Sequence, residues 1–309
     1  TIVRELRKDL VGLRFKDAWT DWAKTLHQAG GLERFKKEIR NKKILSVRRR
    51  AKYIVLDIEG KKTIFIHQKM SGHLLYGKWS RFLPRHKVGV KKSRILDSDK
   101  AESGEFKVGQ WVSTIPGPLR DDRNNQYIRV IMGLNNGYQL ALADLRRFGK
   151  IILVDDKKVD DLKEIRELGP EPLEISFSEF KKLFTNKKGR VKQVIMDPHF
   201  IAGIGNIYAD EILWRANLHP ISRVEHLDDK DLKIIYMAMV SILKSAIKHK
   251  GSSMDDYRTP SGTKGNFQNL HKAYHRTGEK CSRKDGGVIK RLKLGGRSGH
   301  FCPVHQVVK

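Results

Sequence analysis

The chain has 309 residues, enough for two domains, and only two cysteines, too few for a disulfide-linked scaffold. Its 63 lysine and arginine residues outnumber its 35 aspartate and glutamate residues, and the formal net charge of +28 favours nucleic acid as a partner. No apolar run approaches the roughly 20 residues that cross a bilayer, and no signal peptide is visible, so we expect a cytoplasmic protein.

The N-terminal half begins with a helix and then becomes rich in strands. Residues 1–11 place their apolar side chains on one helical face, and Gly12 can end that helix. Three β-strands are predicted next, at 44–48, 53–58 and 63–67. On pattern alone, Lys52 is a solvated lysine beside three arginines, and Met70 is a core methionine.

Residues 77–126 lack sustained periodicity and mix prolines with basic clusters, so we interpret them as an insertion or a long surface loop. Asn125, near their end, is interpreted as a turn residue. A β-hairpin follows, because an Asn-Gly pair at 136–137 separates two apolar runs. After it, Arg146 and Phe148 fit the end of a strand with a buried aromatic ring and a solvated arginine.

A proline-rich break at 168–172 precedes a helical half, and we expect a domain boundary there. Helices are predicted at about 177–185 and at 229–248. The second of these carries apolar residues at helical spacing, which indicates a face that packs in a core.

The stretch from Lys187 to Ala216 predicts two helices joined by a glycine-rich turn. Gly205, in the turn, can adopt backbone angles that other residues avoid, and the free amides of a helix that begins at Asn206 can bind a phosphate. Lys188 and Lys192 add positive charge nearby. An ordinary helical hairpin with a glycine connector is the alternative.

Several motifs together resemble the formamidopyrimidine-DNA glycosylase family, called Fpg or MutM, and its endonuclease VIII relatives. The longest, DPHFIAGIGNIYADEILWRANLHP at 197–220, resembles the helix-two-turn-helix of that family. Residues 50–53, 67–72 and 144–150 resemble further family segments. The methionine, arginine and phenylalanine that these segments contain favour the Fpg branch over the endonuclease VIII branch.

The resemblance implies a base excision repair enzyme that removes oxidised purines, such as 8-oxoguanine and formamidopyrimidines, and cleaves the strand as an AP lyase by β,δ-elimination. Lys52 and Arg297 are its implied catalytic residues, as proton donors and phosphate clamps. The residues implied to bind DNA are Met70, Asn125, Arg146, Phe148, Lys188, Lys192, Gly205 and Asn206. Of these, Met70, Arg146 and Phe148 would fill the space that a flipped nucleotide leaves.

In the family, the amine of a leading proline is the nucleophile and the next glutamate is the acid/base, in a segment resembling Pro-Glu-Leu-Pro-Glu-Val-Glu. This sequence begins with Thr1, which would lie after that segment. Two hypotheses follow. The sequence is an N-terminally shortened version of a normal enzyme, or the protein is a catalytically inactive relative that still binds damaged DNA.

The tail resembles the family's loop over the everted purine, at 257–267, followed by its hairpin zinc finger. Family members usually carry four cysteines in that finger. Alignment to the Gly-Gly-Val-Ile segment puts Asp285 and His305 where two of these cysteines belong, next to Cys281 and Cys302. All four are competent zinc ligands, so we expect one zinc ion per chain. A metal-free finger is the alternative, because an aspartate ligand is rare in structural zinc sites.

These observations predict an α+β fold with a β-sandwich-like N-terminal domain and flanking helices. A helical helix-two-turn-helix domain with a β-hairpin, zinc-finger-like tail completes it. We place the domains at 1–168, including the insertion at 77–126, at 173–255 and at 256–309. The expected protein is a monomer that binds damaged double-stranded DNA. A general RNA-binding or ribosome-associated protein is a further alternative, which predicts binding indifferent to lesions.

Overall fold

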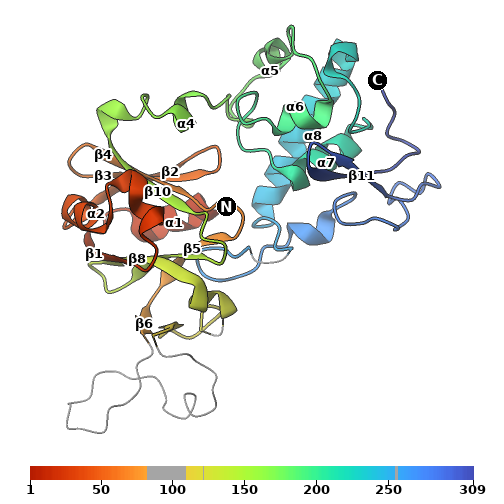
Figure 1. Ribbon diagram of the computed structural model, residues 1–309. Coiled ribbons are helices and arrows are strands. Elements are labelled where there is room, and N and C mark those ends of the chain that lie inside the picture. The colour runs from red at the N-terminus through yellow and green to blue at the C-terminus, as the bar shows by residue number, and fades with distance from the viewer. Residues whose placement is uncertain (82–108, 121, 255–256) are drawn as a thin grey trace, which may run out of the picture. The chain divides into compact units, whose positions relative to one another are not determined.

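The computed structural model describes residues 1–81, 109–120, 122–254 and 257–309 (Figure 1). Part of the predicted insertion, at 82–108 and 121, therefore lies outside the described residues. In the described part, no helix has both the length and the apolarity that a membrane crossing requires. The sheets are antiparallel, and most of the helices follow the strand-rich half of the chain, which confirms the predicted α+β class.

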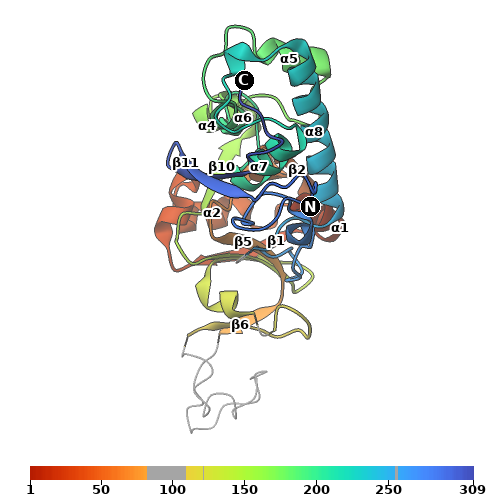
Figure 2. The same cartoon turned by 90° about the vertical axis from the view of Figure 1, so that its right-hand side faces the viewer.

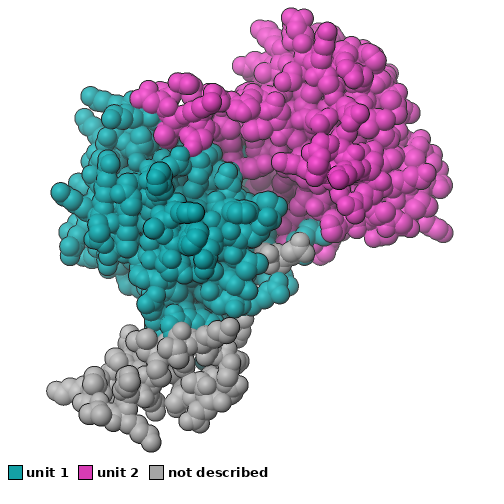
Figure 3. All heavy atoms as spheres, viewed as in Figure 1, with its two compact units in different colours: residues 1–49, 53–159, 254–264 teal, residues 50–52, 160–253, 265–309 magenta. Residues whose placement is uncertain are grey.

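The chain forms two compact units (Figure 3). Unit 1 consists of residues 1–49, 53–159 and 254–264. Unit 2 consists of residues 50–52, 160–253 and 265–309. Residues 50–52 belong to unit 2, although the residues on both sides of them belong to unit 1. Residues 254–264 belong to unit 1, although the residues on both sides of them belong to unit 2. The proline-rich break predicted at 168–172 falls in unit 2, shortly after the division at 159–160.

Two four-stranded sheets form the body of unit 1, and Figures 1 and 2 show them as stacked layers. One sheet contains, in spatial order, β1 (Phe15–Thr20), β8 (Ile128–Leu134), β9 (Gln139–Asp144) and β5 (Gly72–Gly77). The other contains β10 (Lys150–Asp155), β4 (Lys62–His67), β3 (Tyr53–Ile58) and β2 (Ile44–Arg50). The predicted Asn-Gly hairpin joins β8 to β9, with Gly137 at a φ of 77°.

One apolar core draws side chains from both sheets and from the helices beside them. Leu56 of β3 and Leu142 of β9 are fully buried in it. The helices α1 (Ile2–Leu10) and α2 (Leu32–Ile39) and the 3-10 helix η1 (Ala23–Ala29) add further buried residues. Each fully buried leucine or isoleucine contributes roughly 1.5–3 kcal/mol, so these elements hold the sandwich-like layers together.

The strand register brings two turns of unit 1 together. In the β4–β10 pair His67 lies opposite Lys150, and in the β5–β9 pair Gly72 lies opposite Asp144. Since these pairs stand at the strand ends, the turn after β4 and the turn after β9 emerge at the same edge of the sandwich. Residues far apart in the sequence, Met70 and Arg146, thereby become neighbours.

Smaller elements complete unit 1. They are β6 (Trp79–Arg81), β7 (Trp111–Ser113) and the 3-10 helices η2 (Arg123–Tyr127) and η3 (Asp156–Lys158). β6 and β7 form a two-stranded sheet within the sequence range that we interpreted as an insertion. The segment 254–264 joins unit 1 through a hydrogen bond from the Tyr76 N–H to the Pro260 carbonyl (2.8 Å).

Unit 2 is mainly helical. Its elements are α4 (Lys163–Arg166), α5 (Phe177–Leu183), α6 (Val191–Met196), α7 (Asn206–Arg215), η4 (Val224–His226), α8 (Asp229–Lys248), η5 (Phe267–Leu270) and the hairpin β11 (Lys290–Leu294) and β12 (Arg297–Phe301). The predicted helix at 229–248 is confirmed. It begins at a reciprocal capping box in which Asp228 and Asp231 accept each other's backbone N–H. Its apolar face packs in a core with α5, α6 and α7, as predicted.

A buried histidine makes the stability of unit 2 dependent on pH. His271 is 4% exposed, and its Nε2 lies 2.7 Å from the Ser252 hydroxyl. Burial, and then the charges of His275 and Arg276, lower the pKa of His271 from 6.5 to about 4. The unfolded chain therefore takes up a proton on this ring between pH 6.5 and 4 while the folded protein does not, which removes stability as the pH falls.

We expect His271 to account for about 3 kcal/mol of the stability lost between pH 7 and pH 4, as the shift in pKa implies. Urea unfolding of the wild type and of His271→Gln at several pH values measures this loss. The variant should lose less stability on acidification, and the exposed His226→Gln should behave as the wild type does. Parallel pH curves for the wild type and His271→Gln would contradict the assignment.

Candidate functional site

Three predicted site residues of unit 1 meet where the turns after β4 and β9 lie side by side. Met70 is 75% exposed and Phe148 is 53% exposed. The Arg146 guanidinium lies between them, with Nη1 3.4 Å from the Met70 Sδ and the guanidinium carbon 4.8 Å from the centre of the Phe148 ring. Two large apolar side chains held out into solvent around an arginine are suited to entering a base stack.

A buried carboxylate fixes the shape of these turns. Asp144 is 2% exposed and accepts hydrogen bonds from the Ser71 hydroxyl (2.6 Å) and the Gly149 N–H (2.6 Å). The Arg146 N–H in turn donates to the Ser71 hydroxyl (3.1 Å). The turns are therefore bonded to each other, and the exposed side chains start from a rigid base.

Backbone strain marks the same two turns. Lys69, which precedes Met70, has a φ of 55°, and Arg147, which lies between Arg146 and Phe148, has a φ of 59°. A non-glycine residue in this region costs of order 1 kcal/mol, and such residues concentrate at functional sites. No sequence pattern singled out Leu145, which is 50% exposed and adds to this apolar surface.

In unit 2, a second group of predicted residues gathers at the start of α7. The Lys52 Nζ lies 3.3 Å from the Ile204 carbonyl oxygen and 3.7 Å from the point that a Cβ on Gly205 would occupy. Burial of this amine, and then the positive charge of Arg297, lower the pKa of Lys52 below its usual value. Lys52, Gly205 and Arg297 therefore share one basic surface at this helix end.

The turn that carries Lys52 is held firmly within unit 2. Arg50 donates to the Leu168 and Gly169 carbonyls at 2.8 and 2.9 Å, and the Ala51 N–H donates to the Glu171 carboxylate at 2.5 Å. Ala51 has a φ of 51°. Lys52 is exposed as a residue, although the wall beside it desolvates its amine.

The N-terminus of α7 has the free groups that the sequence predicted. No side chain caps this helix, and the Asn206 Oδ1 has no hydrogen-bond partner among the described residues. One detail of the prediction was wrong, because Gly205 has a φ of −111°, which any residue can adopt. The positive φ that requires glycine belongs to Gly203, at 88°. Uncapped amides at a helix start attract anions such as phosphate.

Two predicted DNA contacts do not fit the structure. Lys192 is 2% exposed and forms a 2.6 Å ion pair with Asp210, so its charge is neutralised inside unit 2. Asn125 is 3% exposed, and its side chain accepts from the Trp79 indole (2.8 Å) and donates to the Leu119 carbonyl (2.7 Å). Both side chains serve internal structure. Lys188, in contrast, is exposed in the loop before α6.

The four predicted metal ligands gather in one cluster, with ligand atoms of Cys281, Asp285, Cys302 and His305 all within 4.8 Å of one another. The His305 Nδ1 lies 2.6 Å from the Asp285 Oδ2 and 3.7 Å from the Cys281 Sγ. The Cys302 Sγ lies 3.4 Å from the same carboxylate oxygen. Two thiols, one imidazole and one carboxylate match the donor number and types of a tetrahedral zinc site.

The surroundings of the cluster orient these donors. The His305 Nε2 lies 3.2 Å from the Trp214 carbonyl, which leaves Nδ1 to face the cluster, and the Asp285 Oδ1 accepts from the Gly287 N–H (2.9 Å). A Cβ on Gly287 would lie 2.4 Å from the Cys302 Sγ, so only glycine fits beside that thiol. Outer contacts of this kind orient metal ligands in proteins.

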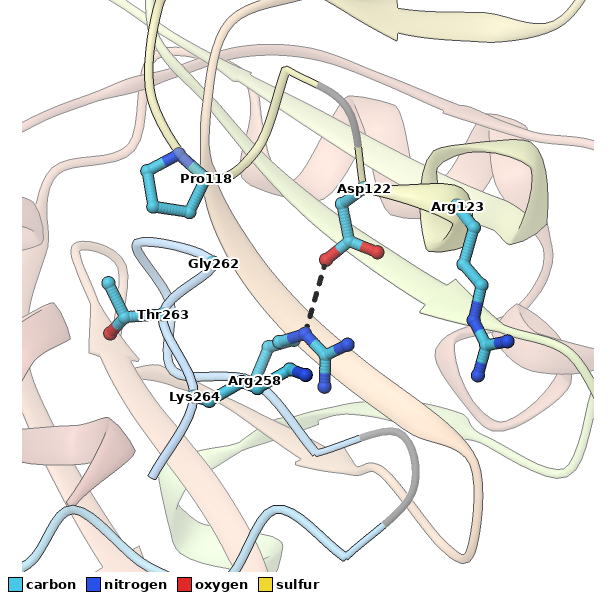
Figure 4. A pocket seen from close by; sticks show the side chains of 7 residues that line it. All are labelled: Pro118, Asp122, Arg123, Arg258, Gly262, Thr263 and Lys264. Atoms are coloured by element: carbon cyan, nitrogen blue, oxygen red, sulfur yellow. Dashed lines mark ion pairs between the residues drawn. The ribbon is translucent and has the colours of Figure 1, made fainter. Parts of the chain in front are cut away.

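Unit 1 contains a further cavity of about 540 Å³ where the segment 254–264 meets the end of the predicted insertion. Figure 4 shows the ion pair between Asp122 and Arg258 (3.6 Å) crossing it. Both side chains are largely buried, at 4% and 12% exposure. Arg258 and Lys264 belong to the predicted loop at 257–267, which the resemblance links to the everted purine. This loop therefore contributes two basic side chains to the lining of the cavity.

Comparison with known proteins agrees with this geometry. The formamidopyrimidine-DNA glycosylase N-terminal domain matches residues 1–151, and the formamidopyrimidine-DNA glycosylase H2TH domain matches residues 168–258. A formamidopyrimidine-DNA glycosylase of Pelotomaculum thermopropionicum is 34% identical over 100% of this chain and 97% of that protein. One of Herpetosiphon aurantiacus is 30% identical over 99% and 97%, respectively.

Solved structures resemble the fold over its whole length. The Lactococcus lactis Fpg in complex with DNA that contains an abasic site has a TM-score of 0.77 and 28% identity, covering 99% of this chain and 97% of that one. The same enzyme in complex with DNA that contains Fapy-dG has a TM-score of 0.76 and 27% identity, with the same coverage.

Proposed function

Because the chain belongs to the formamidopyrimidine-DNA glycosylase family, we propose that it removes oxidised purines from double-stranded DNA and then cleaves the abasic strand. The main support is the basic surface at the start of α7, where the Lys52 amine lies against the Ile204 carbonyl with its pKa lowered by burial and by Arg297. The relatives in solved structures are bound to abasic and Fapy-dG DNA, which supports the same substrates here.

Base removal requires that the damaged nucleotide leave the helix. We assign Met70 and Phe148 to the space that it vacates, because they are exposed apolar side chains on bonded turns. Arg146 lies between them and would donate to the unpaired base on the opposite strand. An unstacked base costs a few kcal/mol, and the inserted side chains offset part of that cost.

Strand cleavage requires proton transfer and phosphate binding. A secondary amine that attacks C1′ displaces the base, which takes up a proton as it leaves, and opening of the sugar ring then gives an iminium ion. The positive charge of that ion acidifies the C2′ proton and permits elimination of the 3′ and then the 5′ phosphate. We assign Lys52 to proton transfer as a donor, since its lowered pKa makes the charged amine a stronger acid than an ordinary lysine. Arg297 and the amides of Gly205 and Asn206 would bind the phosphates, with Lys188 as an exposed contact on the approach.

The nucleophile would come from a leading proline in the family's Pro-Glu-Leu-Pro-Glu-Val-Glu segment, placed directly before Thr1. A terminal amine with a pKa of about 8 is partly neutral at physiological pH and can attack. The alternative is a protein that binds lesions without cutting them. The two hypotheses differ in one product, the covalent protein–DNA complex that forms when borohydride reduces the iminium ion.

Borohydride trapping on a duplex with 8-oxoguanine separates these hypotheses. The chain that begins at Thr1 and the same chain preceded by Pro-Glu-Leu-Pro-Glu-Val-Glu should be compared, with an N-acetylated form of the longer chain as the control. We expect a trapped complex only with the longer chain and its free amine. Tight, lesion-specific binding by the longer chain without any trapped product would instead support the binding protein.

We also propose that Cys281, Asp285, Cys302 and His305 bind zinc. The metal would cross-link the base of the β11–β12 hairpin to the preceding loop, a structural role that needs no open coordination position. Support comes from the donor set, from the hydrogen bond that orients His305, and from the space beside Cys302 that only Gly287 permits.

Elemental analysis of the purified protein should find about one zinc ion per chain. Cys302→Ser should weaken zinc binding at least about tenfold, because the thiolate is the stronger ligand. Asp285→Cys should retain the ion or bind it more tightly, since a thiolate replaces a harder ligand. A metal-free protein that binds lesion DNA as well as the wild type would show that the finger folds without zinc.

A further inference from the structure

Lys192, which is buried and so does not fit its predicted role as a DNA contact, forms an ion pair with Asp210. Both residues make further contacts with another element of unit 2. Lys192 of α6 and Asp210 of α7 are 2% and 0% exposed, and their charged atoms lie 2.6 Å apart. Neither charge is balanced by solvent. An ion pair this deep persists only if the remaining hydrogen-bonding positions of both groups are satisfied.

The hairpin strand β12 supplies hydrogen-bond partners to both groups. The Lys192 Nζ donates to the Ser298 carbonyl at 2.6 Å. The Asp210 Oδ2 accepts from the His300 N–H at 3.0 Å and lies 2.9 Å from the His300 Nδ1. Gly299 lies between Ser298 and His300 in the chain. A Cβ at this position would lie only 3.2 Å from the Lys192 amine, so glycine allows the close approach.

These contacts hold the hairpin at the residues that follow Arg297. Ser298 is the next residue in the chain, so the ion pair fixes the backbone from which the arginine side chain extends. None of the four residues in the metal cluster takes part in these contacts. The hairpin is therefore fastened at two separate places, by the cluster and by the buried ion pair.

We propose that Lys192 and Asp210 are positioning residues that hold the β11–β12 hairpin, and with it Arg297, in place independently of the metal. Asp210 keeps the hairpin on α7, the helix whose N-terminus we assign to phosphate binding, so the arginine and the helix amides stay on one surface. The part of this proposal that concerns DNA rests on the proposed function, and the part that concerns the hairpin does not.

Hydrogen exchange at the amides of residues 298–300 tests the hairpin part directly. The full chain and the variant Lys192→Met/Asp210→Leu should be measured with and without a zinc chelator. With the chelator, the wild type should keep its protection, and the variant should exchange at least about tenfold faster. Arg276→Gln/Glu279→Gln, which removes an ion pair at the surface of unit 2, is the matched control and should behave as the wild type does.

The proposal is overturned if the chelator alone removes protection from the wild-type hairpin as completely as it does from the variant. It is also overturned if the variant keeps full protection with the chelator present. The unfolding midpoint of the variant, followed by circular dichroism, verifies that the comparison is made on folded protein. Apolar replacement of both partners of a buried ion pair is commonly tolerated.

Binding to a duplex with a stable abasic-site analogue tests the part that concerns DNA. In the wild type, Arg297→Ala should reduce the dependence of binding on salt by about one phosphate contact, whereas in the Lys192→Met/Asp210→Leu background it should change that dependence little. An equal effect in both backgrounds would overturn the positioning role. If no form binds damaged DNA, the proposed function fails while the exchange result still decides whether the ion pair holds the hairpin.

Discussion

Lys192→Met is expected to lower the free energy of unfolding by about 3–5 kcal/mol, because it leaves the Asp210 carboxylate buried at 0% exposure without its counter-charge. His300 alone remains to donate to that carboxylate within the hairpin. The expected loss of stability also includes the cost of leaving the Ser298 carbonyl without its hydrogen-bond donor. Urea unfolding at pH 7, followed by circular dichroism, measures the change.

The double variant decides whether the unpaired charge is the cause. Lys192→Met/Asp210→Leu should recover most of the lost stability, since two apolar side chains of similar size can fill the space without a charge to neutralise. Removing the partly exposed pair of Arg276 and Glu279 should cost no more than about 1 kcal/mol. A double variant as unstable as the single one would show that the lysine contributes through packing and not through its charge.

Much of the fold was predictable because local patterns agreed with the tertiary structure. The helix α8 has apolar residues at helical spacing, and in the structure these residues form its buried face. Its Asp-x-x-Asp start forms the reciprocal cap. The Asn-Gly pair between two apolar runs likewise specified the β8–β9 hairpin. In these elements, the residues that determine the conformation are neighbours in the sequence.

Burial of polar residues was not predictable, because their partners are distant in the sequence. Lys192 lies in a basic run that resembles a solvated surface, yet its hydrogen-bond acceptor, Ser298, is 106 residues away. Asn125 stands in a region without periodicity, and its partner Trp79 is 46 residues away. A single sequence gives residue types and spacing, and neither identifies such pairs.

Gly205 and Gly203 show a finer limit. A Gly-x-Gly turn indicates that one of its residues adopts a positive φ, but it does not show which one. In the structure, Gly203 has the positive φ. The metal cluster is the opposite case. Its ligands come from two loops linked by one hairpin, so aligning the motif was enough to select the four residues that the fold brings together.

For the reaction itself, the largest effect is expected from Lys52→Ala. We predict that strand cleavage slows by about 10²–10⁴-fold, the usual contribution of a positioned proton donor or acceptor, while affinity for lesion DNA changes much less. Single-turnover cleavage of an abasic duplex measures the first quantity and a binding titration the second. Lys157→Ala, which removes an exposed lysine of unit 1, should leave both unchanged.

The pH profile of the same reaction identifies the physical cause. Lys52 donates a proton only while it is charged, so cleavage should fall as the pH rises through its pKa. Burial of the amine, and then the charge of Arg297, lower that pKa from 10.5, which places the alkaline limb of the profile below the range of an ordinary lysine.

Arg297→Gln removes the second of these causes. It should lower the plateau rate, because a phosphate contact is lost, and it should move the alkaline limb to higher pH, because the repulsion on Lys52 disappears. The two effects are separable, since one changes the height of the profile and the other its position. An unmoved limb would mean that the charge of Arg297 does not lower the pKa of the group that limits the reaction. An alkaline limb that persists unchanged in Lys52→Ala would mean that this group is not Lys52, and the basic surface at α7 would then bind phosphate without transferring protons.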